Sequence, residues 1–333
     1  MSVSTTTASR EQVLEEIVGA ERFLLVTHEG PDGDAVGSLI AMRGALAELG
    51  KDVVMFLPAS ELPLPYEYAF LSLDGLVTEL PGDLDERTLV FLDCGNLERN
   101  PIAGAGSDGA HVLNIDHHHD NTRFGTVNHV DDAASCTAEI IWDLMGALGL
   151  RAQGDVADAL YVGLVTDTGR FMYDNTGSRA HLMAADLIDA GVDTHGIYRH
   201  LYEGMPFAKL QLLARALGKA QCFDDGRLTL SWLSAADFAE SGSVESYSEG
   251  VIDHLRSVEG TKVAALIRDR LGPGRLDGER KVSLRATDDD VDVSRIARAQ
   301  GGGGHRRAAG FTTQLDDAEL VAFLRAAIAD QLA

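Results

Sequence analysis

Short apolar runs alternate with helix-type segments along the first two thirds of the chain. Four runs have the length of buried strands: residues 23–26, 52–57, 88–92 and 111–115. Apolar residues at helical spacing predict helices before, between and after them, at residues 10–20, 35–49, 136–148, 156–166, 178–190 and 194–202. Strands that alternate with helices predict an α/β fold, in which a mostly parallel sheet is covered by helices.

The pattern changes after a helix-like segment at residues 207–221, which we interpret as a connector. Beyond it, partial alternation of apolar and polar residues predicts strands at 228–233, 262–268 and 281–286. Helices are expected near residues 234–240, 248–258, 292–300 and 316–333, which together indicate a smaller α+β domain. The predicted division is a first domain at 1–205, a helical connector at 206–222 and a second domain at 223–333.

One strand-to-helix loop is rich in residues that bind metals. Residues 27–38, THEGPDGDAVGS, place His28, Asp32 and Asp34 between the first strand and the helix that follows it. Taken alone, this stretch is equally typical of a tight turn before an N-capped helix. A calcium loop fits less well, because Val36 stands where a further oxygen ligand is needed.

Later segments carry residues of the same kind. Asp93 and the cluster Asp116-His117-His118 each follow an apolar strand, and Asp167 ends an apolar helix, where the helix dipole disfavours an unpaired acid. Any one of these residues alone is typical of a turn or a surface cluster. Parallel strands end at a common edge of their sheet, where α/β proteins bind ligands. We therefore expect the side chains to converge at that edge.

The mixture of imidazoles and carboxylates suits divalent ions of intermediate hardness, such as Mn²⁺, Fe²⁺, Co²⁺ or Zn²⁺. Six ligands, drawn from these eight candidate residues, are too many for one zinc ion with an open position. A set of that size suits two ions that share a bridging carboxylate. Two ions roughly 3.5–4 Å apart activate a shared water and stabilise both sides of an in-line displacement at phosphorus. The sequence therefore predicts phosphoester chemistry.

The chain is strongly acidic, with 52 Asp and Glu against 28 Lys and Arg and a net charge of −24. Proteins that track along nucleic acid normally present a basic groove, so we expect no long nucleic acid partner. A small anionic substrate stays compatible with this charge, because a local site can be positive on an acidic protein. Without a signal-peptide pattern, a membrane-spanning run or a CxxC pair, the expectation is a cytoplasmic protein with no membrane partner.

The motifs resemble those of the DHH phosphoesterases. The matching segments are His28-x-x-Pro31-Asp32-x-Asp34-x-x-Gly37-Ser38, Asp93, Asp116-His117-His118-x-x-Asn121 and Asp167-Thr168-Gly169. In the second half, GGGGH at residues 301–305 and AAG at 308–310 resemble the signature of the DHHA1 domain. The resemblance covers nearly the whole chain. Its two-domain length is similar to the branch of nano-RNases, pAp phosphatases and cyclic-dinucleotide phosphodiesterases.

The resemblance implies two divalent ions, with Mn²⁺ expected and Mg²⁺ or Co²⁺ as alternatives. It also implies catalytic roles: Asp93 would bridge the ions, Asp116 would orient an imidazole, and His118 would face the substrate phosphate or the leaving oxygen. The implied ligands are His28, Asp32 and Asp93 for one ion and Asp34, Asp93, His117 and Asp167 for the other.

Substrate binding is implied for the second domain. Its glycine loop would offer backbone N–H groups to a phosphate, His305 would add a donor, and Arg285 would bind the same anion with two hydrogen bonds. Without the family, the loop is more typical of a flexible turn and Arg285 of a strand facing solvent. The glycines concerned are Gly302, Gly303 and Gly304.

The implied reaction is hydrolysis of a short nucleotide, nanoRNA or pAp, to mononucleotides by a hydroxide that bridges two metals, in a cleft between the domains. A cyclic di-AMP or linear dinucleotide phosphodiesterase is the alternative within the same chemistry. Pyrophosphate is less favoured, since family II pyrophosphatases lack the GGGGH loop. A non-catalytic nucleotide sensor is the alternative from another class. Apolar helices of the first domain leave a homodimer open.

Overall fold

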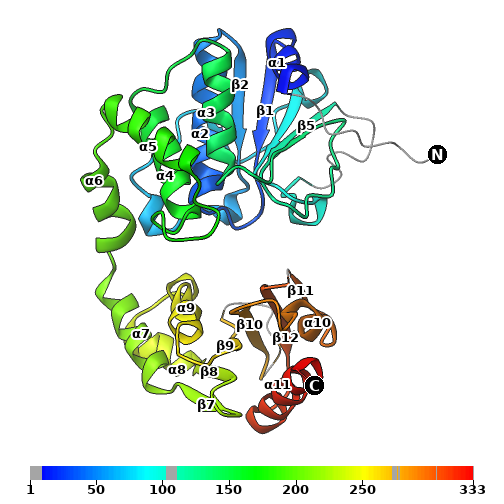
Figure 1. Cartoon of the computed structure of the whole chain (residues 1–333), viewed down its shortest axis with the longest axis vertical. Helices are drawn as coiled ribbons and strands as arrows, with labels where there is room; N and C mark the ends of the chain where they lie inside the picture. The colour runs from blue at the N-terminus through cyan, green and yellow to red at the C-terminus, as the bar shows by residue number, and fades with distance from the viewer. Residues whose placement is uncertain (1–9, 103–110, 272–275, 277, 305, 333) are drawn as a thin grey trace, which may run out of the picture. The chain divides into compact units, whose positions relative to one another are not determined.

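The chain forms two compact units, Met1–Gly204 and Met205–Ala333 (Figure 1). The computed structural model describes residues 10–102, 111–271, 276, 278–304 and 306–332. Each unit is built around its own six-stranded sheet. The predicted α/β first half and smaller α+β second half are both present.

The first unit contains a parallel sheet with the strand order β3-β2-β1-β4-β5-β6. The chain moves outward from β1 to β3 and returns beside β1 as β4, so the order reverses between β1 and β4. Ligands in open α/β sheets bind at such a switch point. Two short strands were not predicted: β3 (Leu76–Val77) and β6 (Val127–Val130). The predicted ones are β1 (Arg22–Val26), β2 (Asp52–Phe56), β4 (Thr88–Leu92) and β5 (Val112–Asp116).

Helices cover one face of this sheet (Figure 1). Helices α2 and α4 pack closely, because Gly37 has no side chain. A Cβ at this position would lie 2.4 Å from the Ala159 carbonyl oxygen. A smaller apolar cluster, which includes Phe91 and Phe124, covers the other face. The helices are α1 (Arg10–Gly19), α2 (Gly33–Glu48), α3 (Thr137–Ala147), α4 (Asp155–Asp167), α5 (Ser178–Asp189) and α6 (Thr194–Tyr198), which continues as a π-helical turn at Arg199–Glu203.

The second unit contains a mixed sheet with the order β11-β12-β10-β9-β8-β7, in which β8 and β9 run parallel and the other neighbours antiparallel. Its strands are β7 (Gln221–Phe223), β8 (Leu228–Leu233), β9 (Val263–Asp269), β10 (Arg280–Ala286), β11 (Gly303–Gly304) and β12 (Ala308–Thr313). Strands β7, β11 and β12 were not predicted. The helix expected at 207–221 ends earlier, at Gly218, because the chain enters β7.

Both faces of this second sheet carry helices. One face packs against α7 (Phe207–Gly218), α8 (Ala235–Ser241) and α9 (Val251–Arg256). The opposite face packs against α10 (Val293–Arg298) and α11 (Asp317–Leu332). Side chains at alternate positions of β10 belong to the second of these cores, namely Val282, Leu284 and Ala286. The intervening positions of β10 therefore point to the α7–α9 face.

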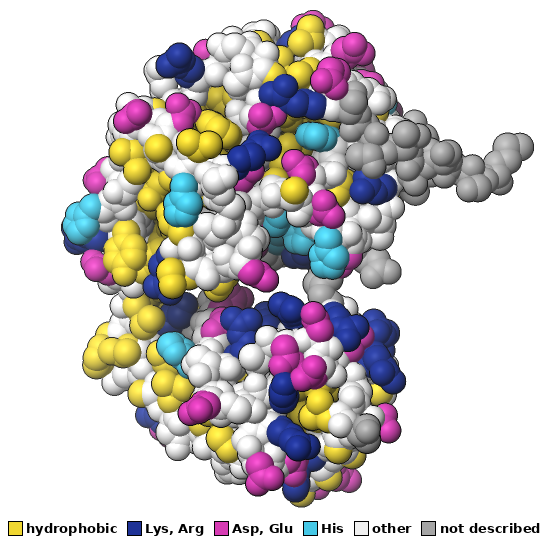
Figure 2. All heavy atoms as spheres, in the orientation of Figure 1, with side chains coloured by type: hydrophobic (Ala, Val, Ile, Leu, Met, Phe, Trp, Pro, Cys, Tyr) yellow, Lys and Arg dark blue, Asp and Glu magenta, His cyan; other side chains and the backbone are white. Residues whose placement is uncertain are grey.

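The two units differ strongly in charge. Residues 1–204 hold 33 acidic and 11 basic residues, a formal charge of −22. Residues 205–333 hold 19 acidic and 17 basic residues, a formal charge of −2. Figure 2 shows Lys and Arg side chains gathered over the end of the second unit that carries α9, β11 and α10. The acidity of the chain is thus concentrated in its first unit.

The cysteine thiols are free, with Cys94 and Cys136 buried and Cys222 exposed. Cys94 follows the end of β4, and its burial raises the pKa of its thiol to about 12. Across the described residues, no helix has the combined length and apolar character that a membrane span requires.

Candidate metal centre

The metal-type residues from separate segments meet at the carboxyl edge of the first sheet. His28 follows β1, Asp93 follows β4 and His117 follows β5, and these three strands are neighbours in the sheet. In each of two groups, the atoms able to bind a metal lie within 4.8 Å of one another. The two triads are His28, Asp32 and Asp93, and Asp34, His117 and Asp167.

Asp93 belongs to the first triad and also faces the second, with one carboxylate oxygen directed toward each. Its Oδ2 is 3.6 Å from Nε2 of His28, and its Oδ1 is 3.6 Å from Nε2 of His117. The Asp93 backbone has φ of 56°, in the left-handed region that Asp tolerates better than most residues and that clusters at functional sites. The side chain is buried. This geometry suits one carboxylate shared by two cations.

Asp32 is a helix cap as well as a member of the first triad. Its Oδ1 accepts hydrogen bonds from the backbone N–H groups of Asp34 and Ala35, both at 3.1 Å, and so caps α2. The Oδ2 atom takes part in neither bond. The two interpretations of this loop, as a capped turn and as a metal-binding segment, are therefore compatible.

Asp34 is fixed by the N-terminus of α3. Its Oδ2 accepts the Thr137 N–H at 2.7 Å and its Oδ1 accepts the Ala138 N–H at 2.9 Å. The Thr137 hydroxyl donates to Asp93 Oδ1 at 3.0 Å. Thr137 thus positions one carboxylate of each triad. Sequence reasoning missed this residue, because a hydroxyl at the start of a helix is common and carries no metal-binding signal.

Asp167 is the last residue of α4, as predicted, and its Oδ2 lies 3.6 Å from His117 Nε2. The Asn175 side-chain amide donates to Asp167 Oδ2 at 3.3 Å and to the Asp167 carbonyl at 3.1 Å. Asn175 is a second positioning residue that the sequence analysis did not identify. Its only signal is its place shortly after the Asp167 motif.

Asp116 is buried and holds the neighbouring imidazole. Its Oδ1 accepts from His118 Nδ1 at 2.8 Å and from the His117 N–H at 2.9 Å. Its Oδ2 accepts from Asn121 Nδ2 at 2.5 Å. Asp116 therefore orients the ring of His118, while His117 points into the second triad.

His28 has its two ring nitrogens in different surroundings. Nδ1 is 2.9 Å from the Glu29 carbonyl, and Nε2 lies on the side of Asp93, 3.6 Å from its Oδ2. The Arg99 guanidinium approaches Nδ1 to 2.7 Å and brings a positive charge to the edge of the triads. Arg99 was also missed from the sequence, since an arginine in an irregular segment has no distinguishing pattern.

Burial and crowding perturb the carboxylates of the triads. Burial, and then the charges of Asp93 and Asp167, raise the pKa of Asp34 well above its usual range. Burial also raises the pKa of Asp167 to about 6, against the opposing charge of His117. For Asp93, burial is outweighed by the hydrogen bond with His28 and the charge of His117, so its pKa is lowered. Cations placed among these acids would relieve their repulsion, so the residues fit divalent ions.

The residues predicted to bind substrate in the second unit have different surroundings. Arg285 lines a cavity of about 310 Å³ and donates to the Leu284 carbonyl at 3.0 Å. The Gly302 N–H donates to the Ala297 carbonyl at 2.9 Å. The expected glycine loop is partly a strand, β11. His305 lies outside the described residues.

Packing requires glycine at some positions of this run and not at others. A Cβ at Gly302 would lie 2.2 Å from the Gly310 carbonyl oxygen. Gly304 has φ of 130° and would place a Cβ 2.5 Å from the Ala308 carbonyl oxygen. A Cβ at Gly303 would meet nothing within 4 Å among the described residues. Gly303 is therefore a position where the fold leaves room for a ligand, as is Gly301, where a Cβ would also meet nothing within 4 Å among the described residues.

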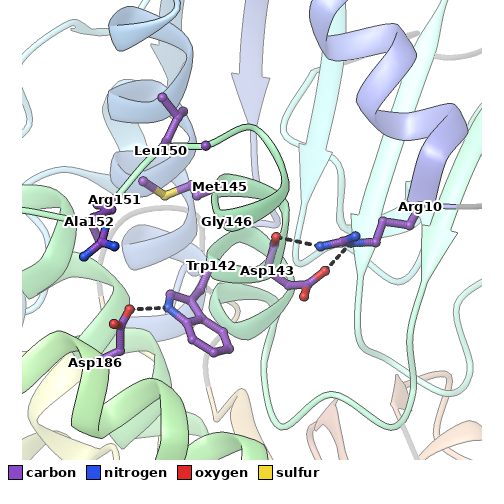
Figure 3. Close-up of a pocket in the computed structure, with 10 residues that line it drawn as sticks. Arg10, Trp142, Asp143, Met145, Gly146, Leu150, Arg151, Ala152 and Asp186 are labelled. Atoms are coloured by element: carbon purple, nitrogen blue, oxygen red, sulfur yellow. Dashed lines mark hydrogen bonds and ion pairs between the residues drawn. The ribbon is translucent and has the colours of Figure 1, made fainter.

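A larger cavity, of about 520 Å³, lies in the first unit among α1, the second half of α3 and the loop after it (Figure 3). The Trp142 indole donates to Asp186 at 2.9 Å, and Arg10 donates to the Asp143 carbonyl at 3.0 Å (Figure 3). None of the triad residues lines this cavity. It is separate from the metal centre, to which α3 contributes its first turn.

Comparison with known proteins agrees with this fold and site. Residues 22–164 match the model of the DHH family, N-terminal domain, and residues 240–333 match that of the DHHA1 domain. A bifunctional oligoribonuclease and PAP phosphatase NrnA from Thermus thermophilus is 33% identical over 310 residues, which cover 90% of this chain and 86% of that protein. The Bacillus subtilis protein of the same name is 26% identical over 312 residues, covering 90% and 92%.

The chain belongs to the DHH family and carries a DHHA1 domain, as its motifs predicted. An exopolyphosphatase-related protein from Bacteroides fragilis has the same fold, with a TM-score of 0.85 at 22% identity, covering 96% of this chain and 95% of that one. RecJ from Thermus thermophilus with Mn²⁺ gives a TM-score of 0.55 at 16% identity, covering 99% of this chain and 56% of RecJ.

Proposed function

We propose that this protein is a di-metal phosphoesterase that hydrolyses short nucleotides, nanoRNA oligonucleotides and pAp, to mononucleotides. The observation that carries this proposal is the pair of neighbouring triads at the switch point of the parallel sheet, with Asp93 of the first triad also facing His117 of the second. The names of the Thermus and Bacillus relatives, oligoribonuclease and PAP phosphatase, support the substrate class. The net charge of −24 argues against a long nucleic acid as substrate.

Two divalent ions are the proposed cofactors, with Mn²⁺ first and Mg²⁺ or Co²⁺ as alternatives. When bound, they would neutralise charge on the substrate phosphate and activate the attacking water. The mixed imidazole and carboxylate set favours an ion of intermediate hardness. The residues proposed to hold them are His28, Asp32, Asp34, Asp93, His117 and Asp167.

His118 is the proposed proton donor to the leaving oxygen. Its Nδ1 is engaged by Asp116, which leaves Nε2 for a substrate. The His118 side chain is 29% exposed, against 14% for His117, so His118 is the more accessible of the two rings. Asp116 would keep the His118 ring in place and would stabilise its charged form.

In the second unit, Arg285 and the open space at Gly303 are proposed to bind substrate. Arg285 lines a cavity, and its planar guanidinium suits two hydrogen bonds to a phosphate.

A cytoplasmic location is proposed because the thiols are free. Exposed Leu182 and Ile188 on α5 make a homodimer through the first unit an expectation, which sedimentation velocity would test.

A hydrolysis panel with Mn²⁺ tests the proposed function. It compares pAp, RNAs of two to five residues, a 24-residue RNA, cyclic di-AMP and pyrophosphate. We expect mononucleotides from the short RNAs and adenosine monophosphate from pAp, with the long RNA spared. Preference for cyclic di-AMP would favour the phosphodiesterase alternative. Tight binding without hydrolysis of any substrate, with metal present, would overturn the enzymatic proposal and leave a nucleotide sensor.

A further inference from the structure

One cavity of the second unit gathers cations from two neighbouring strands. It has a volume of about 310 Å³ and lies on the α7–α9 face of the sheet. Lys281, Ser283 and Arg285 alternate along β10 and line it together. Arg268 on β9 is the register partner of Lys281 and lines it as well. The cavity is thus built from regular strands.

Arg268 is the buried member of the group. It is 8% exposed, and its guanidinium contacts the Ser248 hydroxyl. Its Nε has no hydrogen-bond partner among the residues that the structure describes, and Glu245 Oε1 lies 3.9 Å away. A buried cation with an unsatisfied donor is costly unless a further partner completes its surroundings. Arg268 therefore points to a ligand that these side chains are arranged to receive.

Lys281 and Arg285 have no carboxylate within ion-pair distance among the described residues. Partial loss of water lowers the pKa of both, and the charge of Arg268 lowers that of Lys281 further. Lys262, in the same unit, behaves in the opposite way, because Asp288 and Asp290 raise its pKa. Glu245 and Glu249 oppose the lowering of the Lys281 pKa, and Asp253 opposes that of Arg285, but among the described residues neither cation is ion-paired.

The acids that line this cavity form no ion pair with Lys281 or Arg285 among the described residues. Glu249 and Asp253 also line it. Asp253 forms its ion pair with Arg256 at 3.3 Å. Glu249 forms no ion pair within the described part of the chain. Lys281 additionally lines an adjoining cavity of about 280 Å³ with Gly302 and Gly310, so open space continues past it on the side of the glycine run.

We propose that Lys281 and Arg268 form a second phosphate site beside Arg285, and that this site takes the terminal phosphomonoester of a short nucleotide. The proposal rests on the proposed function for its substrate class. A terminal monoester carries nearly two negative charges and three acceptor oxygens, so it matches clustered cations better than an internal diester. A cavity of about 310 Å³ is at the lower end of the range for small-ligand sites, which suits a phosphate with its sugar.

The test measures binding of two dinucleotides that differ only in this group, pApA and ApA. The full chain is titrated by calorimetry with a metal chelator present, so that neither ligand is consumed. We expect pApA to bind at least about tenfold more tightly than ApA. Lys281→Gln should remove most of that preference and leave ApA binding unchanged. Lys281 is exposed on β10, so the variant is expected to fold.

The matched control is Lys262→Gln, which makes the same change of charge in the same unit. Lys262 pairs with Asp288 and Asp290 and does not line the cavity. The preference for pApA should persist in this variant. Persistence of the preference in Lys281→Gln, or its equal loss in both variants, would overturn the proposed site.

Hydrolysis by the same proteins with Mn²⁺ separates this inference from the proposed function. If the site is correct, Lys281→Gln raises KM for pApA about tenfold and leaves kcat and the kinetics of ApA unchanged. A Lys281-dependent binding preference without any hydrolysis would remove the proposed enzymatic function and keep the anion site. Hydrolysis without a Lys281-dependent preference would keep the proposed enzymatic function and remove the anion site.

Discussion

The candidate sites of the two units are built from opposite charges. In the first unit, buried carboxylates and imidazoles crowd together around Asp93. In the second unit, Arg268, Lys281 and Arg285 share a cavity without a full set of matching acids. The first arrangement suits cations and the second suits the phosphates of a nucleotide. The net charge of the whole chain hides this difference, because nearly all of it belongs to the first unit.

Loss of the shared carboxylate is the strongest way to break the first site. Asp93→Ala should reduce turnover of every substrate by about 10³-fold or more, since the first triad loses a ligand and the second loses the carboxylate oxygen that faces His117. Hydrolysis of pAp and metal content by mass spectrometry measure this. Asp132→Ala, at an exposed position, is the control. Near-normal activity of Asp93→Ala with added Mn²⁺ would contradict the bridging assignment.

A smaller change to the same site removes one hydroxyl. Thr137→Val keeps the backbone N–H that Asp34 accepts and loses the hydrogen bond to Asp93. Residues that orient metal ligands typically contribute about 10–100-fold in metal affinity, and we expect a loss of this order in a Mn²⁺ titration. Thr137→Ser keeps the hydroxyl and should bind as the unchanged protein does. Equal affinity of the Val and Ser variants would remove Thr137 from this role.

Substitution in the second unit should act on substrate and spare the metals. Arg285→Gln removes a cation that lines the cavity, so KM for short nucleotides should rise about tenfold with metal content unchanged. Arg325→Gln is the control, because Arg325 pairs with the exposed Asp224. Loss of bound metal in Arg285→Gln would contradict the assignment of metal binding to the first unit and of substrate binding to the second.

The smallest effects separate two neighbouring glycines. Gly302→Ala forces a Cβ against the Gly310 carbonyl and should cost about 1–3 kcal/mol of stability, measured by denaturant unfolding. Gly303→Ala meets no atom of the described residues and should leave stability nearly unchanged while raising KM a few-fold. Similar losses of stability in both variants would show that position 303 serves packing rather than ligand binding.

Elements with a strong local pattern could be predicted from the sequence. Continuous apolar runs identified β1, β2, β4 and β5, and the triad residues were predicted from the segments after β1, β4 and β5 and from the end of the helix at Asp167. The strand β6 has the mixed sequence VNHV, and β12 begins with small residues, so neither shows clear alternation. These strands are defined by pairing with distant neighbours, which overrides a weak local preference.

The residues that position the carboxylates of the metal centre could not be predicted from the sequence, for a related reason. Thr137 lies 103 residues after Asp34 in the chain and acts through its backbone N–H as well as its hydroxyl. Asn175 acts through a side-chain amide. Neither residue is titratable, so a search for metal-ligand types passes over both. Spacing along the sequence predicted the candidate ligands, and only the tertiary structure showed which residues position them.

The contact between Asp34 and the first turn of α3 has a consequence for the order of events. The carboxylate of Asp34 caps the first turn of α3 and also belongs to a triad, so folding and ligand placement use the same atoms. The side chain is held before any ion arrives, and the conformational entropy of fixing it is lost when the chain folds rather than when the ion binds. The centre is therefore preorganised: its geometry is inherited from the fold, and an arriving ion meets ligands already in position.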